Sequence, residues 1–164
     1  MSEANLENTL YLDIPQGRVV IELRPDIAPM HVAQIKTLVR RGFYDNTPFH
    51  RVIEGFMAQG GDPTGTGTGG SDLDNIRSEF TNEAKFLRGT CGMARSQSPH
   101  SANSQFFIMF APASHLDGQY TIWGQVTEGM ELVDQIKRGS GGGGTVQNPD
   151  RIVKAHLAVD SAPA

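Results

Sequence analysis

The chain has 164 residues and a mass of 17.8 kDa, the ordinary size of one domain, so we expect a single domain across residues 1–164. Its formal charge of −4 argues against nucleic acid or an anionic membrane as partner, because both bind basic surfaces. One cysteine excludes an internal disulfide and disfavours a thiolate metal cluster. Nothing approaches the ~18 apolar residues of a membrane span, and the first residues lack a signal-peptide pattern, so we expect a cytoplasmic protein.

The chain opens with two predicted strands, Thr9–Ile14 and Arg18–Leu23, joined by the turn residues Pro15-Gln16-Gly17. A helix is predicted over Pro29–Arg41, because Val32, Ile35, Leu38 and Val39 recur at helical spacing and proline is tolerated in a first turn.

The rest of the chain consists of short apolar runs between loops. Residues 60–85 are predicted to be mostly loop, because glycine is costly inside helices and strands. A second helix is predicted over Gly129–Arg138, with Met130, Val133 and Ile136 on one face. The remaining predicted strands are Phe49–Ile53, Phe56–Gln59, Thr90–Ala94, Phe106–Phe110, Thr121–Val126 and Ile152–Val159. Many short strands with two helices indicate a mainly β protein, a barrel or a sandwich.

Several common site motifs are absent or weak. Gly65–Gly70 matches G-x-G-x-x-G formally, but no helical apolar stripe follows it, so we interpret it as a plain loop and not a dinucleotide site. No two histidines have the spacing of a helical zinc site, so we expect no metal. Cys91 lies in an apolar strand and is predicted to be a buried, inert thiol.

The block from Phe49 to Asp62 carries more information. Strand alternation predicts that Phe49, Arg51 and Ile53 share one side, which would place a guanidinium in phase with apolar residues. An arginine there is hard to bury without a partner. On periodicity alone, Arg51 reaching solvent or pairing with a carboxylate is an equally good interpretation.

This block resembles the signature of the cyclophilins, a family of peptidyl-prolyl cis-trans isomerases. The similarity continues through Gly67–Gly70, Gly89–Ala94, Asn103–Ile108, Leu116–Gly118 and Trp123–Val126. Five further blocks in the same order cover nearly the whole chain, and the short loops resemble the bacterial form. The resemblance implies a closed eight-stranded antiparallel barrel with a helix over each end.

The resemblance also implies a site on the outer face of the barrel. Arg51 matches the family's catalytic arginine. The apolar pocket for the proline ring corresponds to Phe56, Met57, Phe107 and Leu116, and the positions that hold the peptide chain correspond to Gln59, Gln105 and the backbone around Ala94 and Arg95. His115, Tyr120 and Arg95 depart from the tryptophan, histidine and asparagine common in eukaryotic members, and His115 implies at most weak binding of cyclosporin-type macrocycles.

We therefore expect an isomerase, monomeric by default, that acts on X-Pro bonds in peptides and unfolded chains and assists protein folding. Cis-trans exchange breaks no covalent bond, so a guanidinium aimed at the nitrogen of a twisted amide needs no cofactor to accelerate it. Two alternatives stay open: a proline-segment binding module with incidental activity, and a nucleotide-binding protein, suggested only by the glycines at 65–70.

Overall fold

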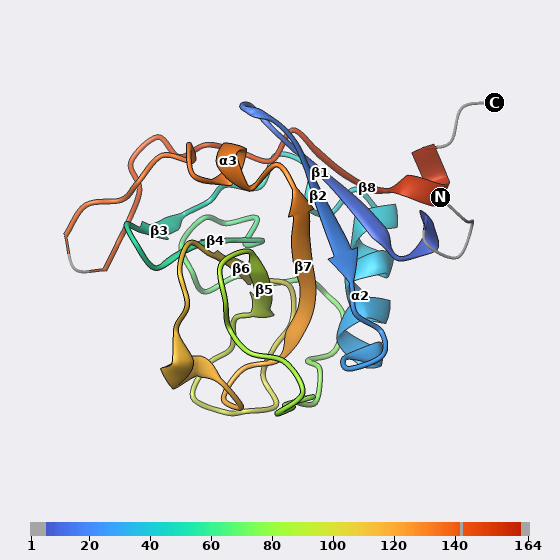
Figure 1. Ribbon diagram of the computed structural model, residues 1–164. Helices are drawn as coiled ribbons and strands as arrows, with labels where there is room; N and C mark the ends of the chain where they lie inside the picture. Colours follow the sequence, from blue (N-terminus) through green and yellow to red (C-terminus); the bar gives the residue numbers. More distant parts are fainter. Residues whose placement is uncertain (1–5, 142, 162–164) are drawn as a thin grey trace.

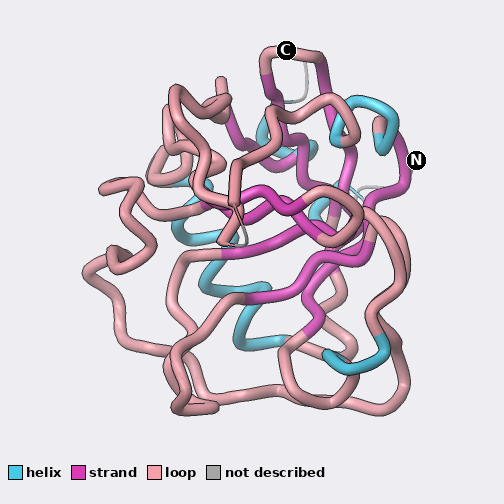
Figure 2. The backbone as a smooth tube through the Cα atoms, turned by 90° about the vertical axis from the view of Figure 1, so that its left-hand side faces the viewer, coloured by secondary structure: helices cyan, strands magenta, loops and turns pink. Residues whose placement is uncertain are grey.

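A computed structural model describes residues 6–141 and 143–161 of the chain. One antiparallel sheet contains all eight strands, in the spatial order β3-β4-β6-β5-β7-β2-β1-β8. The strands are β1 (Thr9–Ile14), β2 (Gly17–Leu23), β3 (Arg51–Ile53), β4 (Met57–Gly60), β5 (Thr90–Met93), β6 (Phe106–Met109), β7 (Ile122–Glu128) and β8 (Lys154–Leu157). The sheet curls strongly, so that its strands surround a common interior (Figures 1 and 2).

Helices pack at two places on this sheet. Helix α2 (Pro29–Arg40) confirms the first predicted helix and buries His31, Val32, Ile35, Leu38 and Val39. Helix α3 (Met130–Val133) lies at the top of the view in Figure 1 and α2 at its lower right. Two short 3-10 helices, η1 (Ser114–Leu116) and η2 (Ala158–Ser161), have no counterpart in the sequence prediction. Every helix in the described part of the chain is too short or too polar to cross a lipid bilayer.

The second predicted helix is wrong in length. Only Met130–Val133 of the predicted Gly129–Arg138 is helical. Beyond Asp134 the backbone hydrogen bonds span three residues and not four: Gln135 N donates to Leu132 O, and Ile136 N donates to Val133 O. The amide of Lys137 then donates to the carboxylate of Asp150 at 2.9 Å, so the chain leaves the helix to join another loop.

Two apolar clusters lie on opposite faces of the sheet. Alternation along β6 sends Phe106 and Ile108 into the large inner cluster, which also contains Trp123. It sends Phe107 and Met109 to the other face, where they form an outer cluster with Met57, Phe86, Ala113, Leu116 and Ile122. The outer cluster supplies apolar surface outside the interior of the curled sheet.

The prediction that Phe49, Arg51 and Ile53 share one side of a strand is wrong for Phe49. Strand β3 begins only at Arg51, so Phe49 precedes the ladder and lies fully buried in the inner cluster. Within β3, Val52 points into that cluster, whereas Ile53 packs against the outer one. Arg51, two residues from Ile53, therefore shares the outer face and not the side of Phe49.

The two ends of the sheet meet through irregular segments. In the described residues no ladder joins β3 to β8. Instead, segment 47–52 bonds segment 144–152: Val52 N donates to Gly144 O at 2.8 Å, Phe49 N to Asp150 O at 2.9 Å and Ile152 N to Thr47 O at 2.9 Å. The expected eight-stranded antiparallel architecture is confirmed as a curled sheet with two helices, without a continuous ladder around it.

Candidate active site

Ten of the eleven predicted site residues line one pocket on the outer face, with a volume of about 310 Å³. They are Arg51, Phe56, Met57, Gln59, Ala94, Arg95, Phe107, His115, Leu116 and Tyr120. The eleventh, Gln105, lines the pocket next to it. Residues spread over more than sixty positions of sequence are thus brought together. We call the pocket lined by these ten residues the apolar pocket.

The floor of the apolar pocket belongs to the outer cluster. Met57 and Phe107 come from neighbouring strands, and Leu116 comes from η1. The Phe107 ring stacks on Phe86, with centroids 5.7 Å apart and an interplanar angle of 23°. Gly92 makes this stack possible, because a Cβ there would lie 2.5 Å from the Phe107 ring and 2.7 Å from Phe86.

Aromatic rings form the walls. Phe56 faces His115 at 5.9 Å, and Tyr120 meets Phe107 edge-on at 5.7 Å and 89°. Phe56 lies in the turn before β4 and packs against the same outer cluster as its neighbour Met57. The result is a hollow with an apolar floor and aromatic walls, which Arg51, Gln59 and Arg95 also line.

Arg51 lies at the edge of this hollow and is half-buried. Its Nε donates to Gly143 O at 3.0 Å and its Nη1 donates to Gln59 Oε1 at 3.2 Å. No carboxylate within the described ranges pairs with it. Arg51 is therefore neither paired with a carboxylate in the described residues nor free in solvent. Two neutral oxygens hold its charge beside the apolar pocket.

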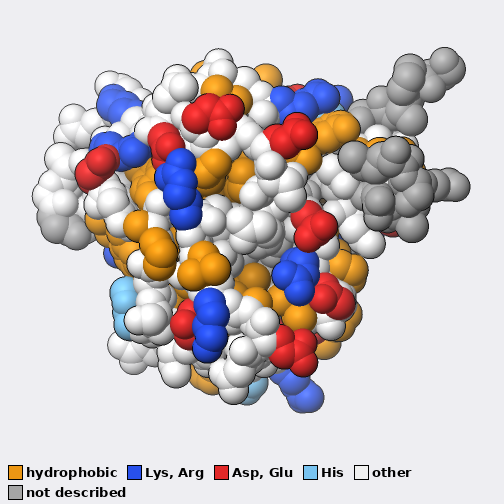
Figure 3. All heavy atoms as spheres, viewed as in Figure 1, with side chains coloured by type: hydrophobic (Ala, Val, Ile, Leu, Met, Phe, Trp, Pro, Cys, Tyr) orange, Lys and Arg blue, Asp and Glu red, His pale blue; other side chains and the backbone are white. Residues whose placement is uncertain are grey.

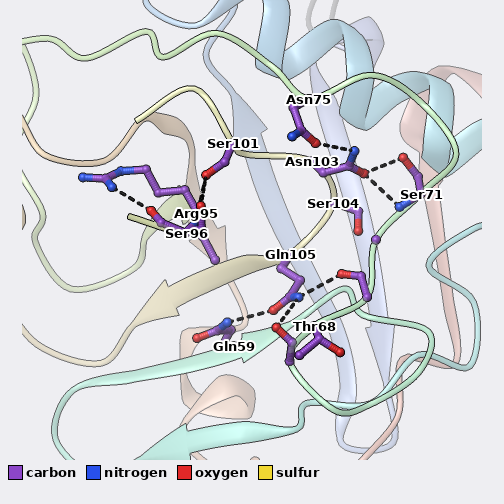
Figure 4. Close-up of a pocket in the computed structure, with 14 residues that line it drawn as sticks. Gln59, Thr68, Ser71, Asn75, Arg95, Ser96, Ser101, Asn103, Ser104 and Gln105 are labelled. Atoms are coloured by element: carbon purple, nitrogen blue, oxygen red, sulfur yellow. Dashed lines mark hydrogen bonds between the residues drawn. The ribbon is translucent and has the colours of Figure 1, made fainter. Parts of the chain in front are cut away.

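A chain of amide contacts positions Arg51. Gln59 Nε2 donates to Gln105 Oε1 at 3.0 Å, and Gln105 Nε2 donates to Gly67 O at 3.0 Å and Gly69 O at 2.9 Å. Figure 4 shows Gln105 between Gln59 and the loop that carries Thr68. We call residues 65–70 the glycine loop. This loop fixes Gln105, Gln105 orients Gln59, and Gln59 orients the Arg51 guanidinium.

The glycine loop is organised by a buried carboxylate. Asp62 accepts hydrogen bonds from the amides of Thr64, Gly67 and Gly69 at 2.8, 2.7 and 3.1 Å, and from the Thr64 hydroxyl. Burial alone would raise the pKa of Asp62, but these hydrogen bonds outweigh it and lower the pKa to about 2. Because the Gly67 and Gly69 amides are occupied, and no helix starts here, the loop does not offer the free N–H groups of a nucleotide site.

A second, polar pocket of about 530 Å³ adjoins the first and shares Gln59, Ala94 and Arg95 with it. Of its other residues, only Gln105 was predicted from the sequence to belong to the site. Hydroxyl and amide side chains dominate the lining: Thr68, Ser71, Asn75, Ser96, Ser101, Asn103, Ser104 and Gln105 (Figure 4). The signal that could have identified it is the serine-rich segment 96–102, directly before the matched block Asn103–Ile108.

Comparisons with known proteins agree with this geometry. The family described as "Cyclophilin type peptidyl-prolyl cis-trans isomerase/CLD" matches residues 9–157. A "Probable peptidyl-prolyl cis-trans isomerase" of Brucella suis is 53% identical, over 98% of this chain and 87% of its own. A "Peptidyl-prolyl cis-trans isomerase" of Helicobacter pylori is 42% identical, over 85% of this chain and 87% of its own.

Solved structures give the same picture. The cyclophilin AquaCyp293 of Hirschia baltica has a TM-score of 0.86 and 31% identity, covering 96% of this chain and 76% of that one. A cyclophilin-type isomerase of Cryptosporidium parvum, crystallised in the presence of the dipeptide Ala-Pro, has a TM-score of 0.84 and 31% identity, covering 91% of this chain and 98% of that one.

Proposed function

This chain belongs to the cyclophilin-type peptidyl-prolyl cis-trans isomerases. We propose that the apolar and polar pockets together form a groove that is the active site, and that Arg51 is the catalytic residue. The observation that carries this proposal is the position of Arg51: an arginine without a carboxylate partner in the described residues, at the edge of an apolar hollow. The whole of residues 1–164 then serves one isomerase domain, and the contacts between segments 47–52 and 144–152 close the barrel.

The chemistry needs only this arrangement. Amide resonance gives the C–N bond partial double-bond character and sets a barrier of about 20 kcal/mol. In the twisted state the resonance is lost, and the nitrogen becomes a better hydrogen-bond acceptor. A guanidinium that donates to this nitrogen stabilises the twisted state more than either planar state, which is differential binding.

The guanidinium does not suffice alone. Millisecond turnover requires an acceleration of about 10⁴, or ~5.5 kcal/mol, whereas one charge-assisted hydrogen bond contributes about 1.5–3 kcal/mol. The pocket floor formed by Met57, Phe107 and Leu116 supplies the remainder by holding the proline ring while the preceding carbonyl rotates. Water is excluded on that side, which strengthens the bond from Arg51.

The peptide chain on either side of the proline contacts the polar part of the groove. Gln59, Gln105 and the backbone of Ala94 and Arg95 bind it, and Phe56, His115 and Tyr120 form the rim. The Cryptosporidium structure determined with Ala-Pro supports proline-containing peptides as the substrate class. We place the activity in the cytoplasm, on a monomer that acts on X-Pro bonds of unfolded or flexible segments, with weak affinity for cyclosporin-type macrocycles.

The test is the cis-to-trans relaxation of a short X-Pro peptide with the wild type, Arg51→Ala and the control Arg151→Ala. Arg151 also donates to a backbone carbonyl, Asn46 O at 2.9 Å, but lines neither pocket. We expect acceleration by the wild type and the control and a large loss in Arg51→Ala. Saturable peptide binding without any acceleration would instead favour a proline-segment binding module.

A further inference from the structure

The groove carries two guanidinium groups and no carboxylate on its lining, in a protein whose net charge is −4. Arg51 and Arg95 are the charged residues that line the two pockets. Asp62 lies beneath the glycine loop, where amide N–H groups and the Thr64 hydroxyl occupy its oxygens, and it lines neither pocket. The groove is therefore locally positive on an acidic molecule.

Most of the other eight arginines are ion-paired, the exceptions in the described residues being Arg77 and Arg151. Six of them pair with carboxylates: Arg18, Arg24, Arg40, Arg41, Arg88 and Arg138. On the face seen in Figure 3, blue and red side chains accordingly lie next to each other. In each pair the carboxylate cancels most of the electrostatic potential that the arginine produces farther away. In the described residues, no carboxylate pairs with Arg51 or Arg95 in the groove.

Arg95 holds its position entirely through neutral groups. Its Nε and Nη2 donate to Gln119 O at 3.0 and 2.7 Å, and its Nη1 donates to Ser96 O at 2.9 Å and Gln97 O at 3.4 Å. A guanidinium has five N–H groups, so these bonds leave one Nη2 hydrogen for a ligand. Carbonyls fix the geometry of the group without neutralising it.

The guanidinium also lies close to the place of the proline ring. Its central carbon is 4.7 Å from the centroid of the Tyr120 ring, and Tyr120 meets the floor residue Phe107 edge-on at 5.7 Å. Figure 4 shows the Arg95 side chain extending away from Gln105, and Arg95 lines both the polar and the apolar pocket. Consecutive Cα atoms are about 3.8 Å apart, so the side chain of a residue one or two positions from the proline can reach this charge.

From these contacts we infer that Arg95 makes the groove selective for substrates with an acidic side chain within two residues of the proline. This inference rests on the proposed function, since it requires the proline in the apolar pocket. The carboxylate accepts the remaining Nη2 hydrogen and is attracted by both guanidinium groups. Arg95 is then a specificity-determining residue and not a catalytic one.

The experiment measures dissociation constants of fluorescent X-Pro peptides that carry Asp or Asn at each of the two positions before and after the proline. At low salt we expect the Asp peptide to bind about two- to five-fold more tightly than its Asn partner at one position or more, because a partly exposed ion pair has about this effect. The ratio falls towards one in 1 M salt, where the Debye length is about 3 Å.

Variants separate charge from structure. Arg95→Gln is expected to abolish the preference for Asp, Arg95→Lys to retain most of it, and the control Arg151→Gln to leave it unchanged. Equal binding of Asp and Asn peptides at all four positions, or a preference that persists in Arg95→Gln, would overturn the inference. Because binding is read without turnover, a failure here is distinct from a failure of Arg51 as the catalyst, which appears only in the isomerisation rate.

Discussion

At the scale of single residues, the position of one guanidinium depends on two amides. Gln59 accepts from Arg51 and donates to Gln105, so it connects the guanidinium to the glycine loop. Among the residues that the structure describes, Gln59→Ala leaves the Arg51 guanidinium bonded to Gly143 O alone. We expect the isomerisation rate of a saturated peptide to fall about three- to ten-fold, the effect of about 1 kcal/mol.

A double variant checks that Gln59 acts through Arg51. If it does, Gln59→Ala should lower the rate much less when Arg51 is already alanine, because residues that act as a unit are not additive. Full additivity of the two effects would show that Gln59 contributes independently. Exchange rates of one peptide with the four proteins of the cycle decide between these outcomes.

The residues expected from the sequence to form the site line two adjoining pockets, and most of them lie in blocks that resemble one family throughout. The prediction from sequence failed where a strand starts later than its apolar pattern suggests. Phe49 and Arg51 are two positions apart, yet Phe49 bonds segment 144–152 before the β3 ladder begins and lies inside the sheet. No local pattern reveals such a partner about one hundred residues away.

At the scale of elements, Asp62 is the centre of the glycine loop. Its pKa of about 2 lies below the usual 3.8, so the ionised form stabilises the fold. This stabilisation, about 2 kcal/mol, is complete above about pH 5 and is lost as the pH falls through 3.8 towards 2. We expect Asp62→Asn to unfold in less urea than the wild type at pH 7, with the difference almost gone at pH 2.

The matched control is Asp72→Asn, an exposed carboxylate paired with Arg41. It should change the free energy of unfolding by less than about 1 kcal/mol at any pH, as exposed pairs generally do. Urea titrations of the three proteins at pH 7, 5, 3 and 2 provide the comparison. A difference between wild type and Asp62→Asn that stays constant from pH 7 to pH 2 would contradict this account of Asp62.

Helix α3 shows what a periodic pattern predicts and what it does not. The apolar spacing over Gly129–Arg138 indicated correctly that Val133 and Ile136 are buried. It did not indicate that the helix ends at Val133. The chain leaves the helical path there to form the bond between the Lys137 amide and the Asp150 carboxylate. That partner lies in another loop, so only the tertiary structure defines the end of this helix.

At the scale of the whole molecule, the single cysteine reports on global opening. Cys91 lies in β5 with no exposed surface, and burial raises the pKa of its thiol. We expect no reaction with a thiol-specific reagent under native conditions and a rate that rises with urea in parallel with the unfolded fraction. Rapid labelling of the native protein would contradict the packing around β5; labelling of the urea-unfolded chain is the positive control.

The architecture was predicted as far as its strands, their antiparallel arrangement and one full helix. How the ends of the sheet meet could not be predicted, because it depends on backbone hydrogen bonds between segments 47–52 and 144–152 that leave no side-chain pattern. Those bonds also bring Gly143 to Arg51, so the contact between these two segments and the position of the Arg51 guanidinium have a common origin.

The central claim is that Arg51 stabilises the twisted amide and not the planar one. The most direct measurement is NMR exchange spectroscopy of an X-Pro peptide at saturating concentration, together with its dissociation constant, for the wild type and Arg51→Ala. We predict that the exchange rate falls about 10- to 100-fold while the dissociation constant changes less than about three-fold, because the lost bond of 1.5–3 kcal/mol forms only in the twisted state. An unchanged exchange rate, or a loss confined to binding, would contradict the claim.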